Sequence, residues 1–165
     1  MPAQVDARIQ ISVDSKEVEA MLRRAPAKVK STLQELVMRS LIDTQREMRI
    51  NAPAGVGGGK GLRGSIRFFV EQSGLAGKVE PTAKYALPLE EGSRPHWVSV
   101  KEGSPLREWA DLKGISPFAV QRSIAKKGTK PHPFVAPTSL TMTPRIYQLF
   151  NMGISSMVED LNNGR

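Results

Sequence analysis

The segment Ala54–Gly61 (AGVGGGKG) is the part of the sequence closest to a phosphate-binding loop. A Walker-type loop needs a glycine, four residues and then Gly-Lys-Ser/Thr, placed between a strand and a helix. Here Ala54 occupies the first glycine position, and Gly61 replaces the hydroxyl residue that would hold the metal ion. Residues 59–64 match G-x-G-x-x-G, but we expect a helix before them and a strand after them. That order is the reverse of the one that brings a pyrophosphate to a helix N-terminus, so we predict no nucleotide site.

The other side chains that could do chemistry form no catalytic or metal-binding pattern. His96 and His132 each stand beside a proline, and neither has the helical spacing of a zinc motif such as H-E-x-x-H. Glu90 and Glu91 fall on a predicted strand, where neighbouring side chains point to opposite faces and cannot share a substrate. No serine stands in a G-x-S-x-G elbow. We therefore predict a protein that is not an enzyme and that uses no cofactor, metal ion or small-molecule substrate.

The composition limits the compartment and the kinds of partner that we expect. The 165 residues include no cysteine, which excludes disulfides and thiolate metal sites and fits a reducing compartment. No segment approaches the roughly 20 apolar residues of a membrane helix, so no membrane partner is expected. Hydrophobic residues make up 39% of the chain and aromatic residues only 5%. With so little apolar material, we expect part of the surface to belong to a partner interface or to loops that become ordered on assembly.

Positive charge is concentrated in one part of the chain. The net charge is +8, and residues 94–131 hold 8 Lys or Arg against 3 Asp or Glu. Two interpretations stay open. The stretch could face nucleic acid or an acidic protein surface, with Lys126, Lys127 and Lys130 as the contacts. It could also be an ordinary solvated face, because no groove-reading motif or interleaved aromatic residues accompany it.

Hydrophobic periodicity predicts a small antiparallel sheet of three to five strands. Period-two alternation marks a first strand over residues 8–13 and a three-stranded meander between Gly61 and Ser93. The meander strands are expected over 66–71, 76–81 and 84–90, with a turn at Ser73-Gly74. Pro88 cannot donate to a ladder, so the last of these strands should lie or end at an edge.

Helices are expected before and after the meander in the sequence. A long amphipathic helix runs from Pro26 to Asn51, and a last helix opens at Thr143-Pro144. Two short helices, 104–114 and 116–128, begin with Ser-Pro and end at glycine. The predicted fold is α+β, with a small antiparallel sheet packed by a long N-terminal helix and a C-terminal helix. We expect one domain over 1–165, in which 94–131 is a basic, partly helical insertion.

Three motifs stand in order between residues 50 and 137. Residues 61–66 (GLRGSI) follow an Asn-Ala-Pro helix end. Tyr85-Ala86 precedes Glu-Glu-Gly-Ser at 90–93, and residues 124–134 (IAKKGTKPHPF) lead to the last helix. Together these motifs resemble the neck or tail-completion proteins of long-tailed phages, of the minor tail protein Z type. Ser93 stands where that family usually has threonine.

The resemblance implies a structural virion protein that joins phage head to tail, assembled in the host cytoplasm. Its subunits would form a homo-oligomeric ring around the DNA channel. The implied partners are copies of itself, the tail terminator or tail tube and the head connector, with DNA passing through. We expect the Gly55–Gly61 loop and the 94–131 insertion to reach these neighbours. The candidate interface residues are Arg63, Arg67, Tyr85, Glu90, Glu91, Trp97, Trp109, His132 and Phe134.

The charged residues and the two tryptophans also have an ordinary interpretation. The charged ones could be surface charges worth about 0–1 kcal/mol each, and the tryptophans could pack in a satellite core. The alternative function is a basic nucleic-acid-binding module that uses the 94–131 stretch.

Overall fold

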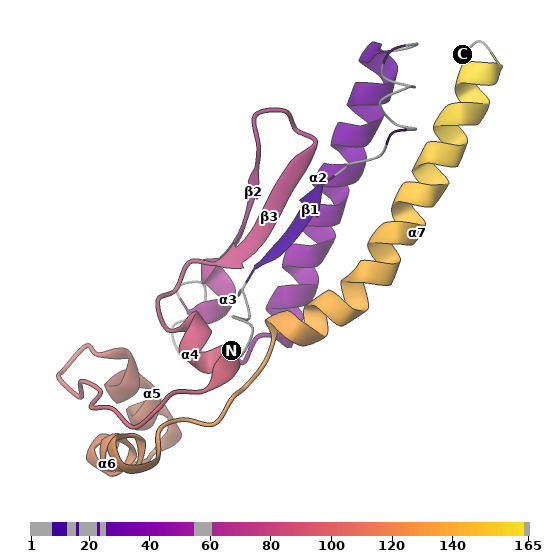
Figure 1. The fold of residues 1–165 in the computed structure, drawn as a ribbon. Coiled ribbons are helices and arrows are strands. Elements are labelled where there is room, and N and C mark those ends of the chain that lie inside the picture. The colour runs from indigo at the N-terminus through magenta and orange to yellow at the C-terminus, as the bar shows by residue number, and fades with distance from the viewer. Residues whose placement is uncertain (1–7, 13–15, 17–22, 24–25, 55–60, 164–165) are drawn as a thin grey trace.

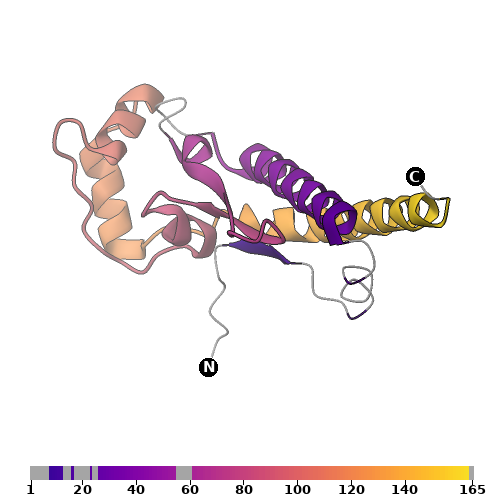
Figure 2. The ribbon, with the colours of Figure 1, turned by 90° about the horizontal axis from the view of Figure 1, so that it is seen from above.

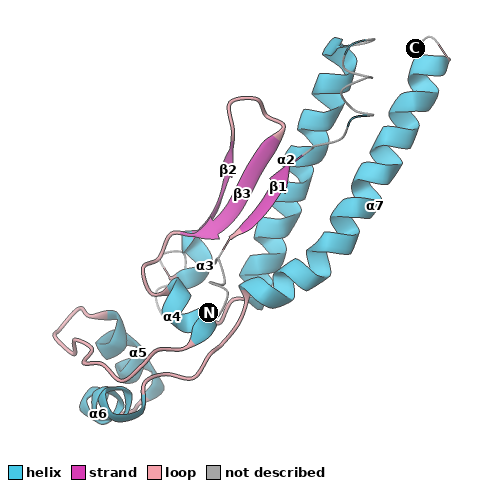
Figure 3. Cartoon of the chain, in the orientation of Figure 1, coloured by secondary structure: helices cyan, strands magenta, loops and turns pink. Residues whose placement is uncertain are grey.

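The computed structural model describes residues 8–12, 16, 23, 26–54 and 61–163. They form an α+β fold in which a three-stranded antiparallel sheet packs against two long helices (Figures 1 and 3). The strands are β1 (Ile9–Ser12), β2 (Ile66–Val70) and β3 (Ala76–Pro81), in the order β1-β3-β2. The long helices are α2 (Pro26–Asn51) and α7 (Val135–Asn162). The short helices are α3 (Leu62–Ser65), α4 (Ala86–Glu91), α5 (Pro105–Lys113) and α6 (Pro117–Lys127). The predicted fold class is confirmed.

Helix α2 lies at the centre of the packing, because one of its sides is completely buried. Its buried apolar residues recur every three or four positions and include Val29, Leu33, Val37 and Leu41. Leu41 packs onto β3 at Gly77, where a Cβ would come within 2.5 Å of the leucine Cδ1 and 2.6 Å of the Phe69 carbonyl oxygen. The missing side chain therefore allows the helix to lie close against the sheet.

The third predicted strand of the meander is wrong, since residues 86–91 form helix α4. Strand β1 takes the third place in the sheet instead, paired with β3 from Ile9↔Val79 to Ser12↔Ala76. Pro88 is tolerated because it falls in the first helical turn, where its missing N–H would have no helical acceptor. The same run has a helical interpretation, because Ala86 and Glu90, four positions apart, are both buried.

Helix α7 begins eight residues before the predicted start at Thr143-Pro144, and Pro144 lies inside it. The carboxylate of Glu90 makes this earlier start possible. Its Oε2 accepts hydrogen bonds from the backbone N–H of Phe134 (2.6 Å) and Val135 (3.0 Å), and its Oε1 accepts one from Ala136 (3.0 Å). Helix N-termini leave such donors without partners, so the side chain acts as a cap supplied from α4. Helix α7 bends in its orange N-terminal part (Figure 1), as expected where a proline interrupts the ladder.

The two short helices of the insertion are confirmed as α5 and α6. Residues 94–128, which we call the arm, stand apart from α2 and α7 in both views (Figures 1 and 2). All of the arm is described, and none of it belongs to the two buried apolar clusters formed by the described residues. Its two ends meet at a junction of Gly92, Ser93, Gly128 and Thr129. There Ser93 and Thr129 exchange two backbone hydrogen bonds of 3.1 Å each.

The geometry of the junction predicts that substitution of Gly128 will disturb it. Its backbone has φ 71° and ψ −161°, a region open almost only to glycine, and a Cβ there would collide with the Ser93 carbonyl oxygen. In Gly128→Ala we expect the amides of Ser93 and Thr129 to exchange hydrogen about tenfold faster or more. The matched control is Gly114→Ala at φ 66°, where nothing lies within 4 Å of the added Cβ. Equal exchange at the junction in both variants would contradict this account.

Two sequence-based expectations concern the loop between α2 and β2. Residues 55–60 of the expected contact loop lie outside the described residues. The last three residues of the G-x-G-x-x-G match, 62–64, already lie in the helical turn α3, and β2 begins directly after that turn. The helix at this place has four residues and leads into a strand, so it differs from a dinucleotide-binding unit.

Candidate functional site

The candidate interface residues divide into an exposed group and a buried group. The exposed ones are Arg63, Arg67, Tyr85, Glu91, Trp97 and His132, and Trp109 is half-buried. Glu90 and Phe134 are buried. The three predicted polyanion contacts, Lys126, Lys127 and Lys130, are all exposed.

Phe134 and Glu90 have roles inside the chain. The Phe134 side chain is completely buried in the main apolar cluster, together with Val37, Leu41 and Ile66. The Glu90 carboxylate holds the start of α7, as described above. Because neither side chain reaches the surface, we remove both from the set of candidate contacts with a neighbouring subunit.

The two arginines near β2 make different contacts. Arg63 donates from Nε to the carbonyl oxygen of Ala52 at 2.9 Å, which ties α3 to the end of α2. Arg67 lies opposite Glu80 in the β2–β3 register. Two pairs further along that ladder, Lys78 stands 5.3 Å from the centre of the Phe69 ring and 2.8 Å from Glu80. Arg67 therefore belongs to a mixed, partly exposed surface on the sheet.

The tip of the arm carries an apolar surface that the sequence analysis did not identify. Leu112 at the end of α5 is 71% exposed, and Phe118 in the first turn of α6 is 53% exposed. Ile115 in the intervening turn is exposed as well. The two helices pack little of their surface on a core, since α6 contains no buried residue and α5 only Ala110. We call Leu112, Ile115 and Phe118 the arm tip.

Trp97 adds a second exposed apolar group on the arm. It is 74% exposed, and it lies in the extended segment that leaves the junction. The neighbouring Val98 carbonyl oxygen accepts a hydrogen bond of 2.7 Å from Gln121 Nε2, so this segment is attached to α6. An exposed tryptophan on a fixed backbone is a suitable anchor for a protein contact.

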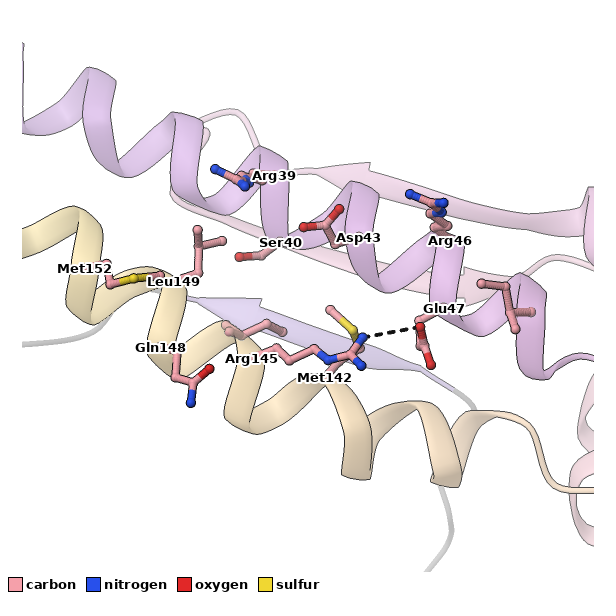
Figure 4. Close-up of a pocket in the computed structure, with 12 residues that line it drawn as sticks. Arg39, Ser40, Asp43, Arg46, Glu47, Met142, Arg145, Gln148, Leu149 and Met152 are labelled. Carbon is pink, nitrogen blue, oxygen red and sulfur yellow. Dashed lines mark ion pairs between the residues drawn. The ribbon is translucent and has the colours of Figure 1, made fainter.

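A groove of about 470 Å³ lies between α2 and α7 (Figure 4). Arg39, Asp43 and Arg46 line it from α2, and Met142 and Leu149 line it from α7.

Across the same groove, Arg145 Nη1 of α7 lies 3.5 Å from Glu47 Oε2 of α2. The pair is largely open to solvent on the arginine side, so it contributes about 0–1 kcal/mol to the packing of the helices. We interpret the groove as the polar margin of the α2–α7 contact.

The described residues show no sign of metal chemistry. Among them, no group of three or more His, Cys, Asp or Glu side chains is placed to hold a metal ion. His96 Nδ1 lies 2.8 Å from the Arg94 carbonyl oxygen, and His132 Nδ1 lies 3.0 Å from that of Lys130, so both rings pair locally with backbone. In the same part of the chain, no helix has the length and apolar character needed to cross a membrane.

The exposed apolar residues of the arm are candidate sites for contact with another molecule. Comparisons of the chain with protein-family models, with curated proteins and with solved structures found no match.

Proposed function

We propose that this chain is a structural subunit of the head–tail junction of a long-tailed phage, where copies of it form a ring around the DNA channel. The observation that carries the proposal is the arm, which leaves the body and presents Trp97, Leu112 and Phe118 to solvent. Large apolar side chains in such positions are stabilised when a partner covers them. The sequence motifs described above supply the identity of the assembly.

The position of the arm favours a head-to-tail contact. It lies at the opposite end of the molecule from the C-terminus of α7 and is connected to the body through a single junction (Figures 1 and 2). A projecting surface that meets a different surface on the next copy makes a heterologous contact, and such contacts close into rings when the rotation allows. Arg67, Tyr85 and Glu91 are exposed on the body and remain candidates for the receiving surface.

The proposed partners follow from the same assembly. One side of the ring would meet the tail terminator or tail tube, and the other side would meet the head connector. The protein would then reside in the virion, at the neck, after assembly in the host cytoplasm.

The test is the mass of the native assembly, measured by native mass spectrometry with and without tail tubes. We expect a closed homo-oligomer, and we expect Leu112→Ser with Phe118→Ser to shift it to monomer by at least about tenfold in dissociation constant. Leu140→Ser is the control, because Leu140 is 80% exposed on α7 and is not part of the arm.

Three results would contradict the proposal. The first is a protein that stays monomeric in every buffer and with tail partners. The second is a loss of assembly in the Leu140 control that equals the loss in the arm-tip variant. The third is a monomer that binds duplex DNA, which would favour the alternative of a nucleic-acid-binding module.

A further inference from the structure

The base of the arm carries a dense positive surface that the proposed ring contacts do not use. We call Arg94, Arg122, Lys126, Lys127 and Lys130 the basic face. All five side chains are exposed. Among the residues that the structure describes, none of the five makes an ion pair.

The basic face exists because the fold joins two separate segments. The Ser93–Thr129 bridge places Arg94 beside the end of α6, and a Cβ at Gly128 would lie 3.0 Å from the Arg94 carbonyl carbon. The Gln121–Val98 hydrogen bond keeps the outgoing chain along α6. Within α6, Arg122 and Lys126 are four residues apart and share a helix side. The backbone of Arg94 therefore lies beside the basic end of α6, although the two are distant in sequence.

Acidic side chains are few in the sequence around this surface. No Asp or Glu occurs between Asp111 and Glu159. The acidic residues of the arm are in α5 or just before it, and Asp111 is paired with Arg107 at 3.0 Å. Glu90, next to the junction, is buried and bonded to α7, so Glu91 is the exposed acid closest in sequence. The basic face consequently carries an excess of positive charge.

The types of residue indicate which acidic partner fits. Three of the five side chains are lysines, which are depleted at protein–protein interfaces, where arginine and aromatic residues are preferred. Lysines suit a partner with a dense row of single charges. Duplex DNA is such a partner, with one phosphate charge per about 1.7 Å of axis. No aromatic residue is interleaved with Lys126, Lys127 and Lys130, so base stacking is not expected there.

We infer that the basic face binds the phosphate backbone of duplex DNA, without regard to base sequence. Contacts to phosphates position a protein on DNA but carry no sequence information. The inference concerns a surface separate from the arm tip, so a ring and a monomer could both bind through it. Non-specific affinities of this kind have dissociation constants of roughly 10⁻⁴–10⁻⁶ M at physiological salt.

The test is fluorescence anisotropy with a short labelled duplex between about 50 and 200 mM salt. The variant replaces Lys126, Lys127 and Lys130 with glutamine. We expect binding about tenfold weaker or more at the lower salt concentration. The slope of log K against log salt should fall by about 2–3, since each lost phosphate contact removes about 0.9. Two duplexes of unrelated sequence should bind equally well.

The matched control replaces Lys16, Lys30 and Lys84 with glutamine, which removes the same net charge from exposed positions on the body. It should keep nearly the wild-type affinity and slope. Thermal unfolding of both triple variants should stay close to wild type, because exposed substitutions usually change stability by about 0.5 kcal/mol or less.

Three outcomes would overturn the inference. One is no measurable duplex binding at low salt. Another is an equal loss of DNA affinity in the two triple variants, which would indicate that binding depends only on the net charge of the protein. The third is a preference for poly-L-glutamate over duplex DNA, which would assign the surface to an acidic protein. Native mass measured on the same samples separates this test from that of the ring, because a ring without DNA affinity would contradict only the present inference.

Discussion

Replacing Phe134 with alanine is expected to lower the free energy of unfolding by about 3–5 kcal/mol. The ring is completely buried in the main cluster, at the point where the chain enters α7. Removing it costs the transfer free energy of the side chain and leaves a cavity lined by residues of α2 and the sheet. Chemical denaturation followed by circular dichroism would measure the loss.

Phe118→Ala is the control for this prediction, because it removes the same side chain from an exposed position on α6. It should cost less than about 1 kcal/mol in the isolated subunit. The contrary result is a Phe134→Ala protein of wild-type stability that has lost assembly. Phe134 would then be an interface residue, as its sequence motif indicated.

Replacing Glu90 with alanine is expected to destabilise the protein by about 2–4 kcal/mol. Three backbone N–H groups at the start of α7 lose their acceptor, and two of them, on Phe134 and Val135, belong to buried residues. The negative charge at a helix N-terminus is lost at the same time. Glu90→Gln should cost less, since its carbonyl oxygen can still accept from part of the set.

Glu91→Ala provides the matched control, since Glu91 is the exposed neighbour in the same helix. It should change stability by no more than about 0.5 kcal/mol. Hydrogen exchange gives a second measurement, in which the amides of Val135 and Ala136 should lose protection in Glu90→Ala. Unchanged exchange at these two amides would show that the carboxylate does not hold the helix start.

The two predictions concern one region, where three helices meet. Glu90 comes from the end of α4, and Asn51 at the end of α2 donates from Nδ2 to Thr138 Oγ1 at 3.0 Å. Thr138 in turn donates to the Phe134 carbonyl oxygen at 2.6 Å. The start of α7 is therefore fixed by polar contacts to two other elements as well as by the buried phenylalanine. Both substitutions should also disturb the junction, because His132 N–H donates to the Leu89 carbonyl oxygen at 2.7 Å.

Local patterns were sufficient to predict the elements whose signals lie within a few residues. The apolar spacing from Val29 to Met48 determined the buried side of α2. The Ser-Pro starts and glycine ends determined α5 and α6, because a proline fits a first turn and a glycine accepts positive φ. The turn at Gly74, with φ 71°, follows from the same property of glycine.

Contacts between residues distant in sequence decided the helical state of α4, the start of α7 and the exposure of the arm tip. The run from Tyr85 to Glu90 suits a strand or a helix by its own pattern, and burial of Ala86 and Glu90 selected the helix. Glu90 and the N–H groups that it binds are more than 40 residues apart, so no local pattern could show that it caps α7. Exposure of Leu112 and Phe118 depends in the same way on where the arm leaves the body. Residue types and spacing determine which elements can form, but burial and pairing are properties of surfaces that exist only after the chain has folded.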